Sequence, residues 1–391
     1  MSCVSYLDKQ LGGMIVVWKR LGDLAHIKNG KDHKTLAEGE FPVFGSGGIM
    51  RYADTYAYNK PSVLIPRKGS LGNLFFVDVP FWNVDTIFYT EIDETQIRPK
   101  YLYYFLTTAG LGEMNQAGGV PSQTQSVLNE LKIPIPCPDN PKKSLEIQAE
   151  IVRILDSFTE LTNELNNELT ARKKQYNHYR DQLLSFEDGE VEWKMLGWVG
   201  DVRMCKRILK NQTSDSGDIP FFKIGTFGKN PDAYIPRDLF EEYKDRYNYP
   251  KVGEVLISAS GTIGRAVIFN GEDAYFQDSN IVWIENDESK VLNKYLFYFY
   301  QVANWNVSDG GVIKRLYNDN IKKTLIPIPF PNDPKRSLAE QARVVAILDK
   351  FDTLTNSITD GLPRELEQRQ KQFTYYRNLL LSFPKPKEVE A

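Results

Sequence analysis

The segment Ile133-Pro134-Ile135-Pro136, followed by Ser144-Leu145, returns later in the chain as Ile326-Pro327-Ile328-Pro329 followed by Ser337-Leu338, 193 residues further on. Such self-similarity is the mark of a duplicated architecture. The match therefore predicts that the chain contains two copies of one structural unit.

The repeat continues beyond these residues. Gln148 matches Gln341 at the same shift, and Leu183-Leu184-Ser185-Phe186 matches Leu380-Leu381-Ser382-Phe383 at a shift of 197. The second copy consequently carries four extra residues.

Each copy has apolar residues at intervals of three and four, which is the period of an amphipathic helix. The first helix is predicted over 144–186, a length of about 60 Å. The second is predicted to open with Ser337-Leu338-Ala339-Glu340, a capping-box pattern, and to kink or break at Gly361 and Pro363. The predicted apolar stripes consist of Ile151, Ile154, Leu155, Phe158, Leu161, Leu165 and Leu169, and of Val344, Ile347, Leu348, Phe351, Leu354 and Ile358.

Two similar helices of this length are expected to bury their stripes against each other as an antiparallel coiled coil, because neither can do so alone. The alternative is that each helix caps its own domain.

The regions before the two helices are related as well. Val63-Leu64-Ile65 leading to Gly69-Ser70-Leu71-Gly72 resembles Val255-Leu256-Ile257 leading to Gly261-Thr262-Ile263-Gly264, and short β-rich runs surround both. An α+β fold is predicted, with two tandem α/β modules, each followed by a long helix, in a pseudo-twofold, near-cyclic arrangement. The predicted parts are a helical stub at 1–14, a first module at 15–140, a helical region at 141–187, a second module at 188–333, a second helical region at 334–384 and a tail at 385–391.

Composition excludes several classes of protein. The chain has 391 residues, of which 41% are apolar and 25% charged, as in soluble globular proteins. Neither a membrane-spanning run nor a signal-peptide pattern is evident, so a cytoplasmic protein without membrane contact is expected. The cysteines and histidines are scattered, which argues against disulfides and against metal sites; they are Cys3, Cys137, Cys205, His26, His33 and His178.

No sequence pattern indicates catalysis. The chain lacks a phosphate-binding Gly-x-x-x-x-Gly-Lys-Ser/Thr loop, a His-Glu-x-x-His zinc motif, and the Asn/Asp-Pro-Pro-Tyr tetrapeptide of adenine methyltransferases. The glycine-rich run 43–48 is not followed by the helix and acidic residue of a nucleotide-binding fold. A non-enzymatic protein without cofactors of its own is expected.

The two modules share a framework, differ in their loops and are joined by a helical spacer. This arrangement is suited to recognising a split DNA sequence, because a spacer of fixed length sets a fixed gap between two half-sites. The formal net charge of −3 argues against indiscriminate coating of nucleic acid. Loops rich in Arg, Lys, hydroxyl and amide groups serve base edges and phosphates. The candidate DNA-binding residues are Gly45, Ser46, Gly47, Arg67, Lys68, Ser70, Ser122, Gln123 and Thr124 in the first module, and Lys223, Thr226, Ser258, Ser260, Thr262, Arg265, Lys314 and Arg315 in the second.

The duplicated order of these motifs resembles the specificity subunit of type I restriction-modification systems, over about Trp18 to Phe383. The resemblance implies two target-recognition domains that each read one half of a bipartite, asymmetric site in double-stranded DNA. It also implies a coiled coil that sets the spacer and docks two methyltransferase subunits, through which restriction subunits are recruited. S-adenosylmethionine, ATP, Mg²⁺ and adenine methylation would belong to those partners.

Within the first helix, Glu160-Leu161-Thr162, Glu164-Leu165-Asn166 and Glu168-Leu169-Thr170 are successive four-residue units. They resemble the repeat that sets the spacer length in such subunits, although ordinary coiled-coil spacing with exposed Glu explains them equally well. Three alternatives remain open: the specificity chain of a related two-subunit methylating endonuclease, a coiled-coil scaffold with peptide-binding modules, and a catalytic methyltransferase.

Overall fold

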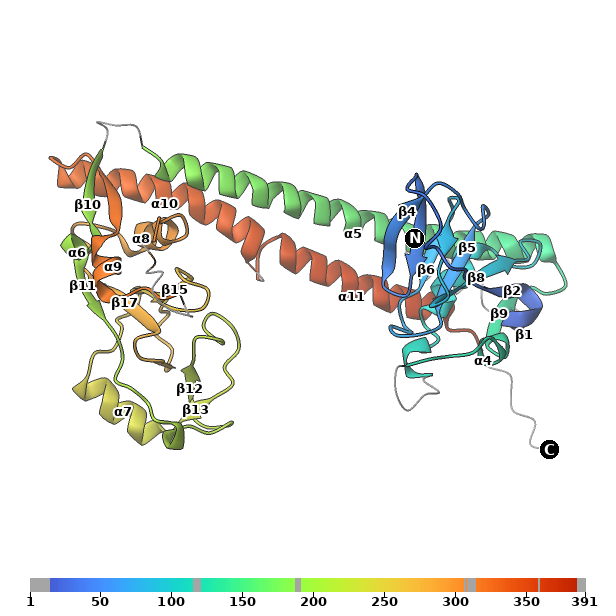
Figure 1. Cartoon of the computed structure of the whole chain (residues 1–391), viewed down its shortest axis with the longest axis horizontal. Helices are drawn as coiled ribbons and strands as arrows, with labels where there is room; N and C mark the ends of the chain where they lie inside the picture. The colour runs from blue at the N-terminus through green and yellow to red at the C-terminus, as the bar shows by residue number, and fades with distance from the viewer. Residues whose placement is uncertain are drawn as a thin grey trace. The chain divides into compact units, whose positions relative to one another are not determined.

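The structure is a computed structural model that describes residues 15–114, 121–186, 191–305, 307, 314–357 and 359–384 (Figure 1). The chain divides into two compact units, Met1–Asn166 with Glu365–Ala391, and Asn167–Arg364. The predicted stub at 1–14, the tail at 385–391 and Ile358 lie outside the described residues. Within the described ranges, no helix is long and apolar enough to cross a membrane.

Module 1 is the mixed part of the first unit. Its strands form three sheets, with the orders β2-β8-β5-β6, β4-β3-β7 and β1-β9. Its elements are β1 (Val16–Arg20), α2 (Leu21–Leu24), β2 (Ala25–Asn29), β3 (Phe41–Gly45), β4 (Gly48–Ala53), β5 (Ser62–Pro66), β6 (Phe75–Val77), β7 (Trp82–Asn83), β8 (Ile87–Ile92), α3 (Pro99–Leu106), η1 (Leu111–Glu113), α4 (Gln125–Asn129) and β9 (Lys132–Pro136).

Module 2, in the second unit, repeats this topology strand for strand. Its sheets have the orders β11-β17-β14-β15, β13-β12-β16 and β10-β18, which confirms the predicted duplication. The helix α7 (Arg237–Arg246) has no counterpart between β4 and β5 of module 1, where residues 54–61 are all described. The other elements are β10 (Val191–Met195), α6 (Leu196–Val199), β11 (Gly200–Arg203), η2 (Lys210–Gln212), β12 (Ile219–Phe222), β13 (Tyr234–Ile235), β14 (Val255–Ser258), β15 (Ala266–Ile268), β16 (Tyr275–Phe276), β17 (Ile281–Asn286), α8 (Asn293–Tyr300), α9 (Asn318–Lys323) and β18 (Leu325–Pro329).

The repeated Ile-Pro-Ile-Pro segment is the last strand of each module. In β9 it pairs antiparallel with β1, and in β18 with β10. Among the described residues each ribbon has two strands, so a proline can occupy it without interrupting a central hydrogen-bond ladder. Burial of Ile133 and Ile135, and of Ile326 and Ile328, joins each ribbon to the core of its module.

The first long helix, α5 (Pro141–Leu184), is continuous over 44 residues and begins slightly earlier than predicted. The second begins at Pro334, so the predicted capping box at Ser337 is wrong. Asp333 is the N-cap, and its carboxylate accepts a hydrogen bond from the Arg336 backbone N–H at 3.0 Å. Ser337 is instead buried within the helix, because it accepts a hydrogen bond from Gln341 at 3.2 Å.

The predicted helix break is confirmed. Helix α10 (Pro334–Asn356) ends, and α11 (Leu362–Leu381) begins after five intervening residues. Gly361 turns the chain so closely against α10 that a Cβ atom there would lie 2.4 Å from the Thr353 carbonyl oxygen. Pro363 sits in the first turn of α11, where a missing N–H costs nothing. Glycine and proline therefore build the break together.

The predicted antiparallel pairing of the helices has matching contacts in the two units. In the first unit, the ring of Phe158 in α5 stacks on Tyr376 in α11 at a centroid distance of 5.2 Å. In the second, Tyr179 near the other end of α5 stacks on Phe351 in α10 at 5.3 Å. As residue numbers rise along α5 they fall along its partners, the order of an antiparallel pair.

One residue of the predicted stripes is misplaced. Leu354 is 37% exposed, whereas the neighbouring Thr355 is fully buried and donates a hydrogen bond to the Phe351 carbonyl at 2.7 Å. The apolar stripe of α10 runs through the buried Val344 and Leu348 to the half-buried Phe351, and the next buried residue, Thr355, lies four positions further on rather than three. Leu161, Leu165 and Leu169 are half-buried.

The end of the chain returns to module 1. Leu380, Leu381 and Phe383 belong to the same apolar core as Leu21 and Ile133. The indole N–H of Trp18 in β1 also donates to the Pro384 carbonyl at 2.9 Å. This return agrees with the predicted near-cyclic order of elements.

Candidate nucleic-acid interface

A buried glutamine fixes each module to its long helix. In the first unit, the Gln148 side-chain oxygen accepts from the Arg98 backbone N–H at 2.8 Å, and its amide donates to the Gln96 carbonyl at 3.1 Å. In the second, Gln341 accepts from the Leu292 N–H at 2.9 Å and donates to the Lys290 carbonyl at 3.2 Å. Both side chains are fully buried. The glutamine shared by the repeats therefore satisfies backbone groups that lead into α3 and α8.

A second contact ties α3 and α8 to the same helices. Asp156 in α5 accepts hydrogen bonds from Lys100 at 2.8 Å and from the Tyr104 hydroxyl at 2.7 Å. Its counterpart, Asp349 in α10, accepts from Lys294 at 2.6 Å and from the Tyr298 hydroxyl at 2.7 Å. Burial raises the pKa of both tyrosines, so each stays a neutral hydrogen-bond donor. We call these two groups the aspartate clamps.

In module 1, the structure brings together the three segments singled out from the sequence. The Gly69 N–H donates to the Pro121 carbonyl at 2.9 Å, and Lys68 pairs antiparallel with Ser122. A Cβ atom on Gly69 would lie 3.5 Å from the Ser46 hydroxyl, so the β3–β4 turn borders the same place. The segments around 46, 68 and 122 form one surface cluster, which we call loop cluster 1.

Module 2 builds the corresponding cluster from the corresponding segments. Ser260 pairs antiparallel with Arg315, and the Leu316 N–H donates to the Ala259 carbonyl at 2.8 Å. A Cβ atom on Gly261 would lie 3.4 Å from Ile224 in the β12–β13 connection. The segments around 224, 260 and 315 form loop cluster 2.

Four of the candidate contact residues are buried, and for these the expectation of a DNA contact is corrected. Gln123 is 1% exposed because its amide donates to the Pro66 carbonyl at 2.6 Å. Ser258 accepts from the Arg265 N–H at 3.0 Å, and Ser260 donates to Asn280 at 2.8 Å. Gly45 lies beneath the Met50 side chain, whose sulfur would be 2.6 Å from a Cβ atom there. These residues support the loops from within.

The other candidate residues remain at the surface of the clusters, and their contact with DNA stays a prediction. Arg265 is half-buried because its guanidinium donates to the Phe227 carbonyl at 2.9 Å. The Arg67 guanidinium lies 5.9 Å from the centroid of the Phe88 ring. The exposed members are Gly47, Lys68, Ser70, Thr124, Thr262 and Lys314, and the half-buried members are Ser46, Arg67, Ser122, Lys223, Thr226, Arg265 and Arg315.

A family model described as the type I restriction modification DNA specificity domain matches residues 16–172 and again residues 189–368. The two matches cover both modules and most of the helices. The chain belongs to this family.

Relatives along the whole chain agree with this assignment. A Haemophilus influenzae protein named as a type I restriction enzyme specificity subunit is 47% identical over 97% of this chain and 98% of its own length. The specificity subunit of a type I restriction enzyme of Escherichia coli is 37% identical, with both chains covered completely.

Solved structures support the fold. The S subunit of a type I restriction-modification system from M. genitalium has a TM-score of 0.56 at 16% identity, covering 96% of this chain and 98% of that one. A chain from a study of complex assembly and conformational transition of the type I system has a TM-score of 0.58 at 15% identity, covering 94% and 97%.

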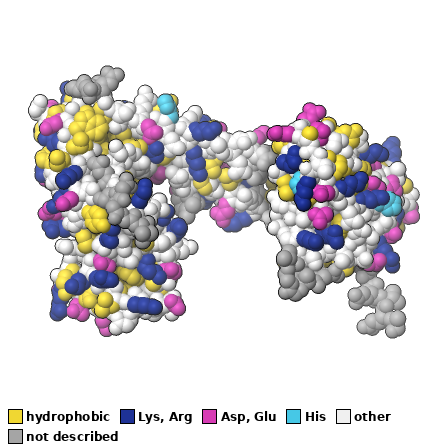
Figure 2. All heavy atoms as spheres, in the orientation of Figure 1, with side chains coloured by type: hydrophobic (Ala, Val, Ile, Leu, Met, Phe, Trp, Pro, Cys, Tyr) yellow, Lys and Arg dark blue, Asp and Glu magenta, His cyan; other side chains and the backbone are white. Residues whose placement is uncertain are grey.

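The surface of the two modules carries mixed charge and is not uniformly basic. Figure 2 shows Lys and Arg side chains interspersed with Asp and Glu on the viewed face of both units. Lys223 in loop cluster 2 pairs with Asp232 at 2.9 Å, which offsets part of its charge. Local cations in the clusters, rather than a broad positive field, are therefore available for phosphate contacts.

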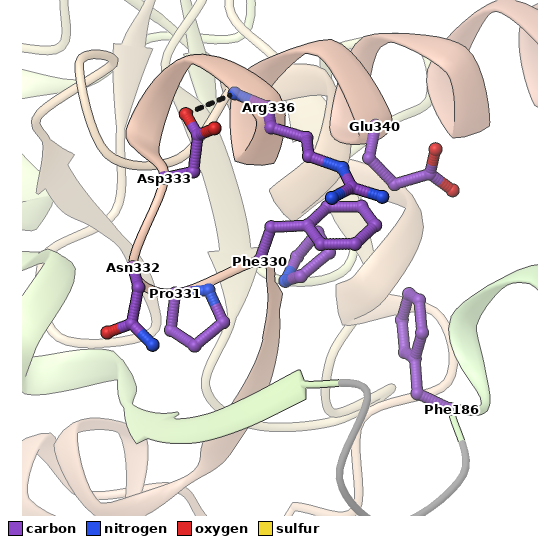
Figure 3. Close-up of a pocket in the computed structure, with 8 residues that line it drawn as sticks. Phe186, Phe330, Pro331, Asn332, Asp333, Arg336 and Glu340 are labelled. Atoms are coloured by element: carbon purple, nitrogen blue, oxygen red, sulfur yellow. Dashed lines mark hydrogen bonds between the residues drawn. The ribbon is translucent and has the colours of Figure 1, made fainter.

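The cavity at the start of α10 does not form a catalytic site (Figure 3). Arg336 lies over the Phe330 ring at 3.8 Å, and Phe186 lines the opposite side. Of the two carboxylates, Asp333 caps the helix, and the hydrogen bond from Arg343 holds the pKa of Glu340 below its usual range. Neither is left as a general acid or base.

The remaining reactive groups give no better site. Burial raises the pKa of the Cys205 thiol to about 12, which leaves it protonated and unreactive at neutral pH. Among the residues that the structure covers, no three His, Cys, Asp or Glu side chains are grouped to hold a metal ion.

Proposed function

We propose that this chain is the non-catalytic DNA sequence-specificity subunit of a type I restriction-modification enzyme, acting in the cytoplasm. Each module reads one half of a bipartite, asymmetric site in double-stranded DNA through its loop cluster. One observation carries this proposal. The two modules have the same strand order and the same buried glutamine anchors, Gln148 and Gln341, but their loop clusters differ in composition. A frame held constant beneath different loops is suited to reading two different sequences.

Catalysis belongs to partner subunits in this proposal. Two adenine-N6 methyltransferase subunits dock on the helices and bind S-adenosylmethionine, and restriction subunits that use ATP and Mg²⁺ join through them. Membership of the family supports this division, as do the charged groups of the α10 cavity, which are already used in capping and ion pairing.

The experiment that tests the function is co-expression of the full chain with its methyltransferase partner, followed by mapping of modified adenines by single-molecule sequencing. One split motif with two defined half-sites across a fixed gap is the expected result. A stable complex that modifies no DNA, or modifies it without sequence preference, contradicts the proposal and favours a scaffold.

The gap length is proposed to depend on α5. The four-residue units at 160–170 lie within this continuous helix, and α5 passes from the first unit to the second between Asn166 and Asn167. Deleting Thr162 to Leu165 shortens a helix by about 6 Å, on the order of one to two base pairs. Methylation mapping is expected to give a shorter gap with both half-sites unchanged. A changed half-site with the original gap would refute this role.

A further inference from the structure

The β3–β4 hairpin of module 1 has a tight turn, and exposed apolar residues follow it. Gly45 pairs with Gly48, so Ser46 and Gly47 form a two-residue turn. Gly48 has φ of +114°, a conformation that favours glycine. The path of the chain into β4 is therefore set by residues that tolerate little substitution.

A β-bulge follows this turn directly. Phe44 pairs with Ile49, but the preceding Val43 pairs with Arg51, so Met50 is the extra residue. Ile49 is 51% exposed and Met50 is 58% exposed. The bulge thus presents two consecutive large apolar side chains at the surface, where an ordinary strand would alternate between its two faces.

The turn that precedes these apolar side chains belongs to loop cluster 1. The turn that precedes them touches the β5–β6 loop, where Gly69 lies beside the Ser46 hydroxyl. The same loop carries Lys68 and pairs with Ser122. A duplex bound at the polar groups of this cluster would therefore lie next to the hairpin turn.

Module 2 has no such feature in the corresponding connection, all of whose residues 223–233 are described. Lys229 and Asn230 are its exposed long side chains, and Lys223 pairs with Asp232. Its large apolar residues are Phe227, which is 1% exposed, and Ile224, which is half-buried. The apolar tip is therefore particular to module 1.

Base edges in the major groove are almost wholly polar, and the exception is the 5-methyl group of thymine. Ile49 and Met50 cannot form hydrogen bonds with bases or ion pairs with phosphates, so an apolar group is the partner that suits them. We propose that Ile49 and Met50 contact thymine 5-methyl groups in the half-site read by module 1. This proposal deepens the proposed function and rests on it.

The test uses the full chain in complex with its methyltransferase partner, and duplexes carrying the mapped site. Deoxyuridine replaces thymidine in one half-site at a time, which removes the 5-methyl group and keeps every base-pairing group. In one half-site alone, the substitution is expected to weaken binding about fourfold per contacted methyl group. Equal binding of thymine and uracil duplexes in both half-sites overturns the proposal, as does a mapped site without thymine in either half.

The double variant Ile49→Ser with Met50→Ser assigns the effect to these residues. It is expected to bind thymine and uracil duplexes equally, while it still distinguishes the other half-site from a scrambled sequence. A thymine preference that persists in the variant contradicts the proposal. If the wild-type complex binds both duplexes alike and the variant binds both more weakly by the same factor, the proposal is also contradicted. That result indicates that Ile49 and Met50 insert between base steps.

The matched control is Val79→Ser. Val79 is 48% exposed and lies in the β6–β7 turn, at the opposite end of β6 from the β5–β6 loop. This variant is expected to keep the thymine preference, and thermal unfolding checks that all variants fold. If the proposed function is wrong, the wild-type complex binds no specific DNA site. If only the thymine contact is wrong, the wild-type complex still binds its site specifically.

Discussion

In module 1, the loop after β5 carries Arg67 and Lys68 and pairs with Ser122, whereas the corresponding loop of module 2 carries Ala259 and Ser260 and pairs with Arg315. The same bridge thus joins a cation to a serine in both, with the two residue types exchanged between its sides. At the junctions with the long helices, Gln148 and Gln341 form the same hydrogen bonds. Duplication has kept the residues that hold each module on its helix and has changed those at the surface.

Replacing Gln148 or Gln341 by Leu is expected to have the largest effect on stability, because each substitution leaves a backbone N–H and a carbonyl buried without partners. The free energy of unfolding should fall by about 3 kcal/mol in either variant, as measured by chemical denaturation. Gln368→Leu, at an exposed position of α11, should change it by less than about 0.5 kcal/mol. A loss in one module without a loss in the other would break the equivalence of the two anchors.

Gly361→Ala probes the difference between the continuous α5 and the broken second helix. The added Cβ would meet the carbonyl oxygens of Thr353 and Leu354, so a loss of about 2 kcal/mol is expected. Gly225→Ala serves as the control in the same unit, because nothing lies within 4 Å of its Cβ position. If both substitutions change the unfolding free energy equally, the close approach at the break has no energetic importance.

Arg67→Ala and Arg265→Ala are expected to weaken DNA binding by the complex about tenfold, or about 1.4 kcal/mol. Each lost phosphate contact should also flatten the dependence of affinity on salt, by about 0.9 in the logarithmic slope. Lys60→Ala, at the other end of β5 from Arg67, is the control in module 1. Unchanged affinity at physiological salt would remove these arginines from the interface.

Asp156→Asn and Asp349→Asn are expected to have the smallest effect. The amide oxygen still accepts from Tyr104 or Tyr298, but the attraction to Lys100 or Lys294 is lost. A decrease of about 0.5–1 kcal/mol in the unfolding free energy is expected in each case. In a Lys100→Met background, Asp156→Asn should cost nothing further; an undiminished loss there would show that the ion pair is not its cause.

Much of the fold could be predicted because each copy of the repeat supports the interpretation of the other. Strands such as Ser62–Pro66 and the break near Gly361 follow from local residue preferences. The start of α10 differs from the prediction because Asp333 and Pro334 form a stronger helix start than the Ser337 pattern. The predicted burial of Leu354 is wrong because the spacing of apolar residues alone does not show whether the buried stripe continues three or four residues after Phe351.

The loop clusters could be predicted only in part. Residue types located the three segments of each module, and the structure brings those segments together. The direction of individual side chains depends on the tertiary path of the chain, so the burial of Gln123 and Ser258 had no signal in the sequence. The aspartate clamps could have been found, because Lys, Tyr and Asp recur in both copies at matching positions.

The most direct test of independent reading is methylation mapping of two loop variants beside the wild-type complex. One variant carries Arg67→Ala with Lys68→Ala, and the other carries Arg265→Ala with Arg315→Ala. We predict that each variant relaxes one half-site, a different one in each case, and leaves the other half-site and the gap unchanged. Both half-sites changing together in either variant would contradict the account of two separate reading modules.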